Sequence, residues 1–377
     1  MRIGINARYI QGKQSGIGIF LRNLILNLKK YDRKNEYVLF FGDKLIPKEI
    51  QETGFECDVP KKPTGNQISK IMWAHCYLPS AAKRRRIDVF HETSFVAPIF
   101  GKIPCVTTVH DTAYLRFPYC YTRRNRLYFK ALVPKTLKKS KLIIAPSNFT
   151  KSDIINTFSV KEEKIRVVYR SVNESFKVLD DKDSLKKVKQ KYGIKGDFVL
   201  SVSAISPRKN LITAIKAFKL LKDKNDFNGQ YVIVGGKGWL YEEVFKEVAD
   251  SGLSEDIVFC EYVPEDDLVS LYNGASVFVY VSLFEGFGIP LVEAMACGLP
   301  IVTSNVSSMP EIAGKAARLV DPNKVEEIAR AISDLSDKAS SLRSTAVELG
   351  LKQAREFSWK KTTKNMIAVY EDAAVRR

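Results

Sequence analysis

Long apolar runs and clustered cysteines are both missing from this 377-residue sequence. A helix that crosses a bilayer needs about 20 apolar residues, and no stretch approaches that length. The N-terminus also lacks the apolar segment of a secretory signal peptide. The six cysteines stand singly, with no C-x-x-C pair and no metal-ligand spacing. We therefore expect a cytoplasmic protein whose cysteines are reduced and which holds no metal.

Acidic residues are scarce relative to basic ones. The chain has 42 Asp and Glu against 60 Lys and Arg, which gives a formal net charge of +18. Its length suggests two domains, and its composition, 45% hydrophobic and 27% charged, is that of a globular protein. Such a charge favours anionic partners, which include nucleic acids, anionic lipid surfaces and ligands that carry phosphate.

Two stretches of the first half contain no acid at all. They lie between Asp58 and Asp88 and between Tyr121 and Lys141, and both interleave Lys and Arg with aromatic residues. A solvated surface would explain such runs equally well. The functional alternative is contact with an anionic membrane, to which each basic residue near the surface contributes roughly 1 kcal/mol.

The most informative stretch is Glu285 to Asn305, which reads EGFGIPLVEAMACGLPIVTSN. Apolar, β-branched residues from Ser276 to Val281 predict a buried strand before it. Pro290 suits the first turn of a helix, and Gly298 supplies a left-handed stop after it. The loop between strand and helix therefore lies at the carboxyl end of a parallel strand, where open sheets bind ligands.

This loop offers groups for an anionic ligand. The helix start exposes free N–H groups, which attract phosphate. They belong to Gly286, Phe287, Gly288 and Ile289. Glu285 in the loop and Glu293 in the first helical turns can face the same crevice. A Glu near a helix N-terminus also compensates the helix dipole, which would explain Glu293 alone. Two acids that flank a Gly-Phe-Gly loop favour a binding site.

The start of the chain predicts a strand, a helix and a second strand at Arg2–Ala7, Phe20–Lys30 and Glu36–Phe41. Before the helix, Gly16 and Gly18 could open a dinucleotide-binding fingerprint. Leu21 occupies the position of its third glycine, and the loop after the strand is too long. A dehydrogenase is therefore disfavoured, and an ordinary turn is the plain alternative for these glycines.

Further polar residues follow predicted strands. His91 and His110 each end a strand of the first half, at the edge where ligands bind, although a histidine is more often structural. In the second half, Arg208 and Lys209 follow the strand Asp197–Ser203 at a turn into a helix. Two cations at such a turn can clamp a diphosphate.

The residues around GFGIPLVEAMACGLPIV, with glutamates eight positions apart, resemble the signature of the retaining glycosyltransferases of family 4, the group-1 transferases. The resemblance extends over almost the whole chain. It implies an α/β protein of GT-B architecture, with two Rossmann-like doubly wound parallel-sheet domains that face each other across a cleft. We place an acceptor-binding domain at 1–178, a nucleotide-sugar-binding domain at 179–356, and a C-terminal helix at 357–377 that packs back on the first domain.

The resemblance also implies roles for individual residues. His110, in a His-Asp pair, would lie beside the donor sugar and hydrogen-bond a hydroxyl, so we favour it over His91. Arg208 and Lys209 would hold the diphosphate, Glu285 the sugar, and Glu293 the ribose hydroxyls. The resemblance further implies that Tyr262 and Val263 contact the nucleotide base. It also implies that the loop with Gly16 and Gly18, the lip of the site, contacts the donor phosphate or the acceptor. The chain departs from the family pattern at Ser203-Ala204, where many members have Gly-Arg, and at Arg170–Asn173, where Asn-Gly is usual.

The segments NARY, SGIG, VHD and PRKN look most like the mannosyltransferase-B-like branch of bacterial surface-polysaccharide synthesis. That branch implies GDP-mannose as donor without a metal cofactor, a lipid-linked glycan as acceptor, and peripheral association of the basic first domain with the inner face of the cell membrane. Three alternatives remain: a UDP-sugar transferase, a sugar-nucleotide epimerase of the same fold, and a basic nucleic-acid-binding protein. The last leaves the two-glutamate loop unexplained, so we expect no nucleic-acid partner.

Overall fold

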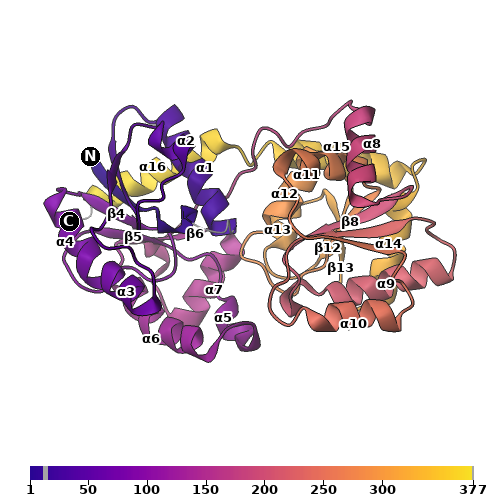
Figure 1. Ribbon diagram of the computed structural model, residues 1–377, viewed down its shortest axis with the longest axis horizontal. Helices are drawn as coiled ribbons and strands as arrows, with labels where there is room; N and C mark the ends of the chain where they lie inside the picture. The colour runs from indigo at the N-terminus through magenta and orange to yellow at the C-terminus, as the bar shows by residue number, and fades with distance from the viewer. Residues whose placement is uncertain (12–15, 376–377) are drawn as a thin grey trace. The chain divides into compact units, whose positions relative to one another are not determined.

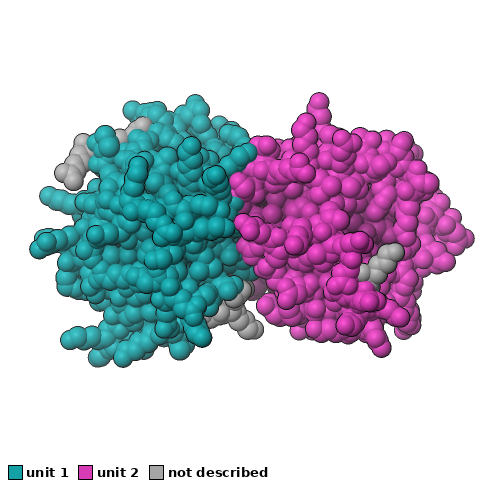
Figure 2. All heavy atoms as spheres, turned by 90° about the horizontal axis from the view of Figure 1, so that it is seen from above, with its two compact units in different colours: residues 1–112, 123–170, 359–377 teal, residues 113–122, 171–358 magenta. Residues whose placement is uncertain are grey.

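The computed structural model describes residues 1–11 and 16–375 (Figure 1). The chain divides into two compact units, which Figure 2 distinguishes by colour. Unit 1 comprises residues 1–112, 123–170 and 359–377, and unit 2 comprises residues 113–122 and 171–358. Each unit is an α/β structure built on its own parallel sheet.

Unit 1 contains a seven-stranded parallel sheet in the order β3-β2-β1-β4-β5-β6-β7. Its strands are β1 Arg2–Asn6, β2 Glu36–Phe40, β3 Glu56–Asp58, β4 Val89–Glu92, β5 Cys105–Thr108, β6 Leu142–Ala145 and β7 Ile165–Val167. Its helices are η1 Arg8–Ile10, α1 Gly16–Tyr31, α2 Lys48–Gln51, α3 Gln67–Met72, the π-helical turn η2 Trp73–Tyr77, α4 Leu78–Arg84, α6 Arg123–Lys139, α7 Asn148–Phe158, η4 Glu162–Lys164 and α16 Trp359–Val375.

Both faces of this sheet are covered, because alternate side chains of each strand point to opposite faces. Ile3 and Ile5 of β1 pack with side chains of α1 and α16 on one face. On the other face, Phe40 and Phe90 pack with η2 and α4. Gly4 lies between those two rings, and a Cβ atom there would lie 2.9 Å from each. The absence of a side chain at Gly4 therefore lets these two rings, and the helices that pack on them, approach β1 closely.

Unit 2 contains a six-stranded parallel sheet in the order β10-β9-β8-β11-β12-β13. Its strands are β8 Phe198–Val202, β9 Gln230–Val234, β10 Ile257–Cys260, β11 Val277–Tyr280, β12 Ile301–Ser304 and β13 Ala317–Val320. Its helices are α5 Ala113–Arg116, η3 Pro118–Cys120, α8 Lys182–Tyr192, η5 Pro207–Lys209, α9 Leu211–Asp223, α10 Glu242–Asp250, α11 Glu265–Gly274, α12 Ile289–Ala296, α13 Met309–Ala313, α14 Val325–Ser336 and α15 Ser341–Ala354.

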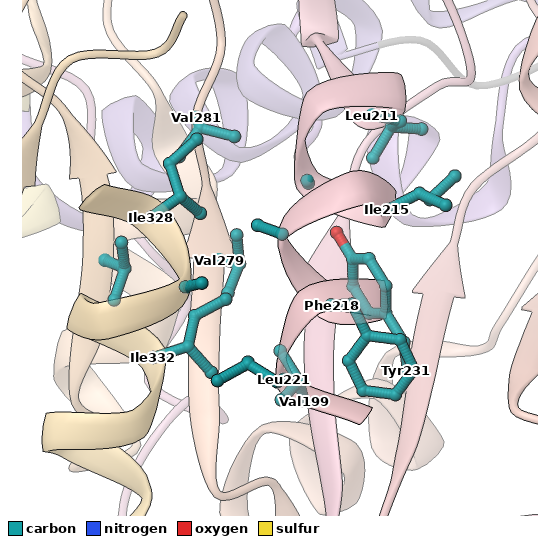
Figure 3. Close-up of a cluster of buried hydrophobic side chains, with 14 of the residues drawn as sticks. Val199, Leu211, Ile215, Phe218, Leu221, Tyr231, Val279, Val281, Ile328 and Ile332 are labelled. Atoms are coloured by element: carbon teal, nitrogen blue, oxygen red, sulfur yellow. The ribbon is translucent and has the colours of Figure 1, made fainter. Parts of the chain in front are cut away.

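The core of unit 2 forms where α9 and α14 cover one face of the sheet (Figure 3). Ile215 and Phe218 of α9 lie beside Tyr231 of β9, and Ile328 and Ile332 of α14 lie beside Val279 of β11. Complete burial of such a side chain contributes about 1.5–3 kcal/mol, so this layer fixes the strands whose ends carry the site.

The unit boundary lies earlier than the predicted 178/179. Residues from Ser171 onward belong to unit 2 because their side chains bond there. Asn173 donates to Glu265 at 2.9 Å, and the Phe176 ring packs against Tyr272. At the other end, unit 2 continues to Ser358, and α16 returns to unit 1, where it packs against α1.

The segment 113–122 also corrects the prediction of one continuous first domain. It belongs to unit 2, where the ring of Phe117 lies 5.9 Å from that of Phe284 and the Arg116 guanidinium lies over the same ring. Helix α1 begins at Gly16, four residues before the predicted start at Phe20.

Candidate functional site

The two chain segments that the sequence singled out in the second half lie side by side in unit 2. Strand β8 has β9 on one side and β11 on the other. The chain therefore continues from β8 toward one edge of the sheet and from β11 toward the other edge. The loops that follow β8 and β11 are therefore adjacent at the carboxyl edge, which is the usual ligand site of such sheets. Leu283 N donates to Arg208 O at 2.9 Å and joins the two loops.

Glu285 lies between two cations that follow β8. Its Oε2 is 2.9 Å from Nη1 of Arg208, and its Oε1 is 2.5 Å from Nζ of Lys209. Lys209 Nζ also donates to Tyr280 Oη at 2.9 Å. The carboxylate is buried at this edge, and the Lys209 side chain is only 12% exposed. The three charges leave a net charge of +1, which suits an anionic ligand.

The pKa of Glu285 reflects a balance of two causes. Burial alone would raise the pKa of the carboxyl, but the charges of Arg208 and Lys209 outweigh it and lower the pKa to about 2. Glu285 is therefore ionised at neutral pH. A permanently ionised carboxylate can accept hydrogen bonds or stabilise positive charge, and it cannot act as a general acid there.

The backbone of the loop is fixed by two serines that the sequence analysis did not identify. Ser307 accepts from Glu285 N at 2.9 Å and donates to Glu285 O at 2.6 Å. Ser308 donates to the carbonyl oxygens of Glu285 and Phe287, both at 3.0 Å. The loop therefore keeps its shape without help from a ligand, because both serines hold its carbonyl groups.

The glycines of this loop let the helix start beside it. Gly288 caps α12 with φ of 91°, a left-handed conformation that glycine adopts at little cost. Ile289 is the first residue of α12, and Gly286 and Phe287 are buried before it. Gly298, as predicted, is left-handed after the helix, with φ of 68°. Of the four residues predicted to supply N–H groups at the helix start, Gly288 and Ile289 belong to it, whereas Gly286 and Phe287 lie in the loop before it.

Glu293 occupies a different environment from Glu285. Tyr272 donates to its Oε2 at 2.8 Å. Burial raises the pKa of Glu293 to about 7, against the lowering effect of that hydrogen bond. Within the described residues, its Oε1 accepts no hydrogen bond. That oxygen can accept from a ligand hydroxyl.

The two residues predicted to contact the base are placed differently. Tyr262 is 79% exposed, whereas Val263 is buried. Neighbouring residues of an extended segment point in opposite directions, so only one of the two can join the core. Both follow β10, which lies two strands from β8. A role in base binding stays a prediction.

In unit 1, His110 follows β5 and is buried, and both of its ring nitrogens have partners. Nε2 lies 2.8 Å from the carbonyl oxygen of Thr93, and Nδ1 lies 2.6 Å from Nη2 of Arg170. A carbonyl only accepts and a guanidinium only donates, so the ring is the neutral tautomer with its proton on Nε2. Burial and the Arg170 charge hold the pKa of His110 well below its usual value. A sugar hydroxyl would have to displace one of these partners.

The other two histidines are structural. His91 bonds Tyr370 of α16 and Thr108 of β5, each at 2.8 Å, and burial lowers its pKa to about 3. His75 contacts the Tyr128 hydroxyl at 3.3 Å and accepts from Ile99 N. His91 therefore ties α16 to the sheet, and the contact of His110 with the donor sugar stays a prediction.

Gly16 and Gly18 lie in the first turn of α1 and not in the preceding loop. A Cβ atom at Gly16 would meet nothing within 4 Å, so no packing requires glycine there. The preceding residues 12–15, including Gly12, lie outside the described residues. Contact of this lip with phosphate or acceptor stays a prediction.

The described residues offer neither a cluster of metal ligands nor a membrane-spanning helix. In residues 1–11 and 16–375, no group of three His, Cys, Asp or Glu side chains is placed to hold a metal ion. Over the same ranges, no helix is long and apolar enough to span a bilayer. The expectation of a metal-independent enzyme stays a prediction.

Family models and curated relatives match both halves of the chain. The family model of glycosyl transferases group 1 matches residues 183–373, and that of glycosyltransferase family 4 matches residues 14–176. O-antigen chain mannosyltransferase B of Escherichia coli is 33% identical over 286 residues, which cover 75% of this chain and 74% of that protein. O-antigen chain mannosyltransferase RfbU of Salmonella typhimurium is 31% identical over 228 residues, which cover 60% of each chain.

The fold has close structural neighbours as well. The sucrose-phosphate synthase from Thermosynechococcus elongatus superposes with a TM-score of 0.80 over 100% of both chains, at 17% identity. The two parallel-sheet units are thus those of the GT-B fold. The chain belongs to the group-1 glycosyltransferases and is a glycosyltransferase.

Proposed function

We propose that this enzyme transfers mannose from GDP-mannose, with retention of configuration, to a lipid-linked glycan in cell-surface polysaccharide synthesis. The observation that carries the proposal is the Arg208–Glu285–Lys209 cluster beside the glycine loop before α12. The likeness to O-antigen mannosyltransferases supports the choice of mannose and of the pathway.

The cluster suits the charges of the reaction. A leaving nucleoside diphosphate gains negative charge as the sugar becomes oxocarbenium-like. Arg208, Lys209 and the N–H groups at the start of α12 meet that negative charge. Glu285, ionised because its pKa is about 2, faces the sugar with a fixed negative charge. The diphosphate would share the two cations with Glu285, so binding rearranges an existing ion-pair network.

Glu293 suits the ribose. A carboxylate can accept hydrogen bonds from two adjacent hydroxyls. Tyr272 donates to only one oxygen of the Glu293 carboxylate. In this proposal the leaving phosphate takes the acceptor proton on the same face of the sugar, which retains configuration. The cations of the chain supply the electrostatic stabilisation, so no metal ion is required.

Unit 1 supports the proposal of a membrane-bound acceptor through its charge. Helix α6 lies in the second acid-free stretch, and the first such stretch contains α3, η2 and α4. His75 of η2 contacts Tyr128 of α6, so the fold brings the two stretches together. Leu127 is 66% exposed on α6, between basic side chains. We propose that this basic surface of α6 binds an anionic membrane.

Thermal shift with GDP, UDP, ADP and NAD tests the donor first, on the wild type and on Glu293→Ala. A ligand that binds only the folded state raises its stability. A shift with GDP alone that the substitution removes supports the proposal, and turnover of GDP-mannose then follows. A shift with UDP alone keeps the enzyme class and discards mannose. No shift with either nucleotide on folded protein contradicts the donor site.

A further inference from the structure

Unit 1 contains a cavity at the point that corresponds to the donor site of unit 2. Strand β1 has β2 on one side and β4 on the other, so the loops after β1 and β4 are adjacent at the carboxyl edge. These loops line a cavity of about 330 Å³ together with residues of α1, α3, η2 and α6. Pockets that hold small ligands begin at about this size, and such switch points are where they occur.

A buried carboxylate lines this cavity. Glu92, at the end of β4, is 1% exposed. Asn6 Nδ2 donates to both of its oxygens at 2.9 Å, and Ser94 N donates to Oε1 at 3.2 Å. Within the described residues, no Lys or Arg forms an ion pair with it. A carboxylate offers about four acceptor positions, so Oε2 can accept a further hydrogen bond from a ligand.

A guanidinium and several aromatic rings line the same cavity. The Arg8 Cζ atom lies 5.1 Å from the centre of the Tyr9 ring and 5.2 Å from that of Trp73, which holds the side chain in one place. The Arg8 side chain donates a hydrogen bond to the Tyr9 hydroxyl at 3.2 Å, and a guanidinium has five N–H donors, so most of them can serve a ligand. Tyr128 and Phe129 of α6 complete an aromatic wall.

The charges of the lining select against an ionic ligand. Burial raises the pKa of Glu92 to about 7, so above that pH its carboxylate would repel an anion, while Arg8 and Lys70 would repel a cation. A neutral ring with adjacent hydroxyls can bind both Glu92 and Arg8. Its hydroxyls donate hydrogen bonds to the carboxylate and accept them from the guanidinium. Its apolar face can lie on the aromatic wall.

We propose that this cavity binds a neutral sugar unit of the acceptor, and that Glu92 fixes the orientation of that unit through its hydroxyls. The identification of the sugar as the acceptor rests on the proposed function. Glu92 is a specificity-determining residue for the acceptor, held in place by Asn6 and Ser94. The donor residues of unit 2 do not contribute to this cavity.

Ligand-observed NMR tests the proposal on the full-length chain. The probes are the methyl glycosides of mannose, glucose, galactose and N-acetylglucosamine, with inorganic phosphate as the charged competitor. Glu92→Gln keeps the shape of the side chain but removes its charge. Gln67→Trp, at a half-buried position on the rim, fills the cavity without changing Glu92. Glu163→Gln, whose side chain is 63% exposed, is the matched control.

The wild type and Glu163→Gln should bind at least one glycoside, and Glu92→Gln and Gln67→Trp should weaken that binding at least tenfold. GDP binding should be the same in all four proteins, which separates a failed cavity from a failed donor site. If all glycosides fail to bind the wild type, or bind Glu92→Gln equally well, the proposal is wrong even when GDP binds. Displacement of the glycoside by millimolar phosphate would also overturn it. Loss of GDP binding in every protein, with the glycosides still bound, would instead refute the proposed function.

Discussion

Lys209 Nζ lies 2.5 Å from Glu285 Oε1, although 76 positions separate the two residues in the sequence. The contact depends on the order of the strands, since β8 and β11 are neighbours in the sheet of unit 2. In the proposed function, this contact places a cation for the leaving diphosphate beside a carboxylate for the sugar. Both charges are present before any substrate binds, so the site needs little reorganisation when charge develops in the transition state.

Removal of the Lys209 charge should slow transfer more than it weakens donor binding. In Lys209→Met, the diphosphate loses one of its stabilising cations, and comparable losses of a transition-state donor lower kcat about 10²- to 10³-fold. Steady-state kinetics with GDP-mannose measures this effect. Lys216→Met, on α9 with a half-exposed side chain 3.7 Å from Glu247, is the control and should leave kcat unchanged. An equal kcat in the two variants would show that Lys209 has no part in the reaction.

Glu285→Gln should lose stability at neutral pH and less so in acid. The folded chain holds the pKa of Glu285 at about 2, below its ordinary 4.5, so ionised Glu285 stabilises the fold above pH 4.5. That contribution declines as pH falls from 4.5 to 2 and amounts to about 3 kcal/mol at neutral pH. Urea unfolding of both proteins between pH 3 and 7 measures it. A constant difference across this range would contradict the ion-pair account.

Glu293 should make donor binding depend on pH near neutrality. Its raised pKa of about 7 means that the carboxylate, the better acceptor for ribose hydroxyls, forms between pH 6 and 8. The affinity for GDP should therefore increase over this range in the wild type and stay flat in Glu293→Gln. Isothermal titration calorimetry measures both.

The same raised pKa has a consequence for stability. An acid whose folded pKa lies above the ordinary value of 4.5 destabilises the fold as pH rises from 4.5 through 7. Glu293→Gln should therefore melt at a higher temperature than the wild type at pH 8 and at nearly the same temperature at pH 5. Tyr272→Phe, which removes the hydrogen bond but keeps the carboxyl, is the matched control and should gain no stability at pH 8.

Local sequence patterns identify the donor loop because its features are contiguous. The β-branched strand, the glycines at 286 and 288 and the proline after them specify their own backbone, and the structure has a strand, a left-handed glycine and a helix there. The helix start at Gly16 was predicted too late because two glycines in a first turn lower helix propensity, which tertiary packing of α1 against α16 overrides.

Contacts between distant residues leave no such pattern. Ser307 and Ser308 bond the backbone of Glu285 from a turn about 20 residues away. Two consecutive serines are common in turns, so the sequence does not mark them as part of the site. Arg170 bonds His110 from a position where the family usually has Asn-Gly, and no local signal announces that pairing. Glu92 was missed for the same reason: a single Glu after a strand acquires meaning only beside Asn6 of the neighbouring strand.

Charge reversal on α6 should release the protein from anionic membranes. Arg124 and Lys130 lie on the exposed side of α6, and each basic residue contributes roughly 1 kcal/mol, so Arg124→Glu with Lys130→Glu should weaken binding at least thirtyfold. Cosedimentation with vesicles of phosphatidylglycerol and phosphatidylcholine measures this at 0.1 M NaCl, and 0.5 M NaCl should weaken wild-type binding because salt screens the attraction. Lys186→Glu with Lys187→Glu, exposed on α8 of unit 2, makes the same change in net charge. If both double variants lose binding equally, net charge alone is responsible and the α6 surface is not the membrane site.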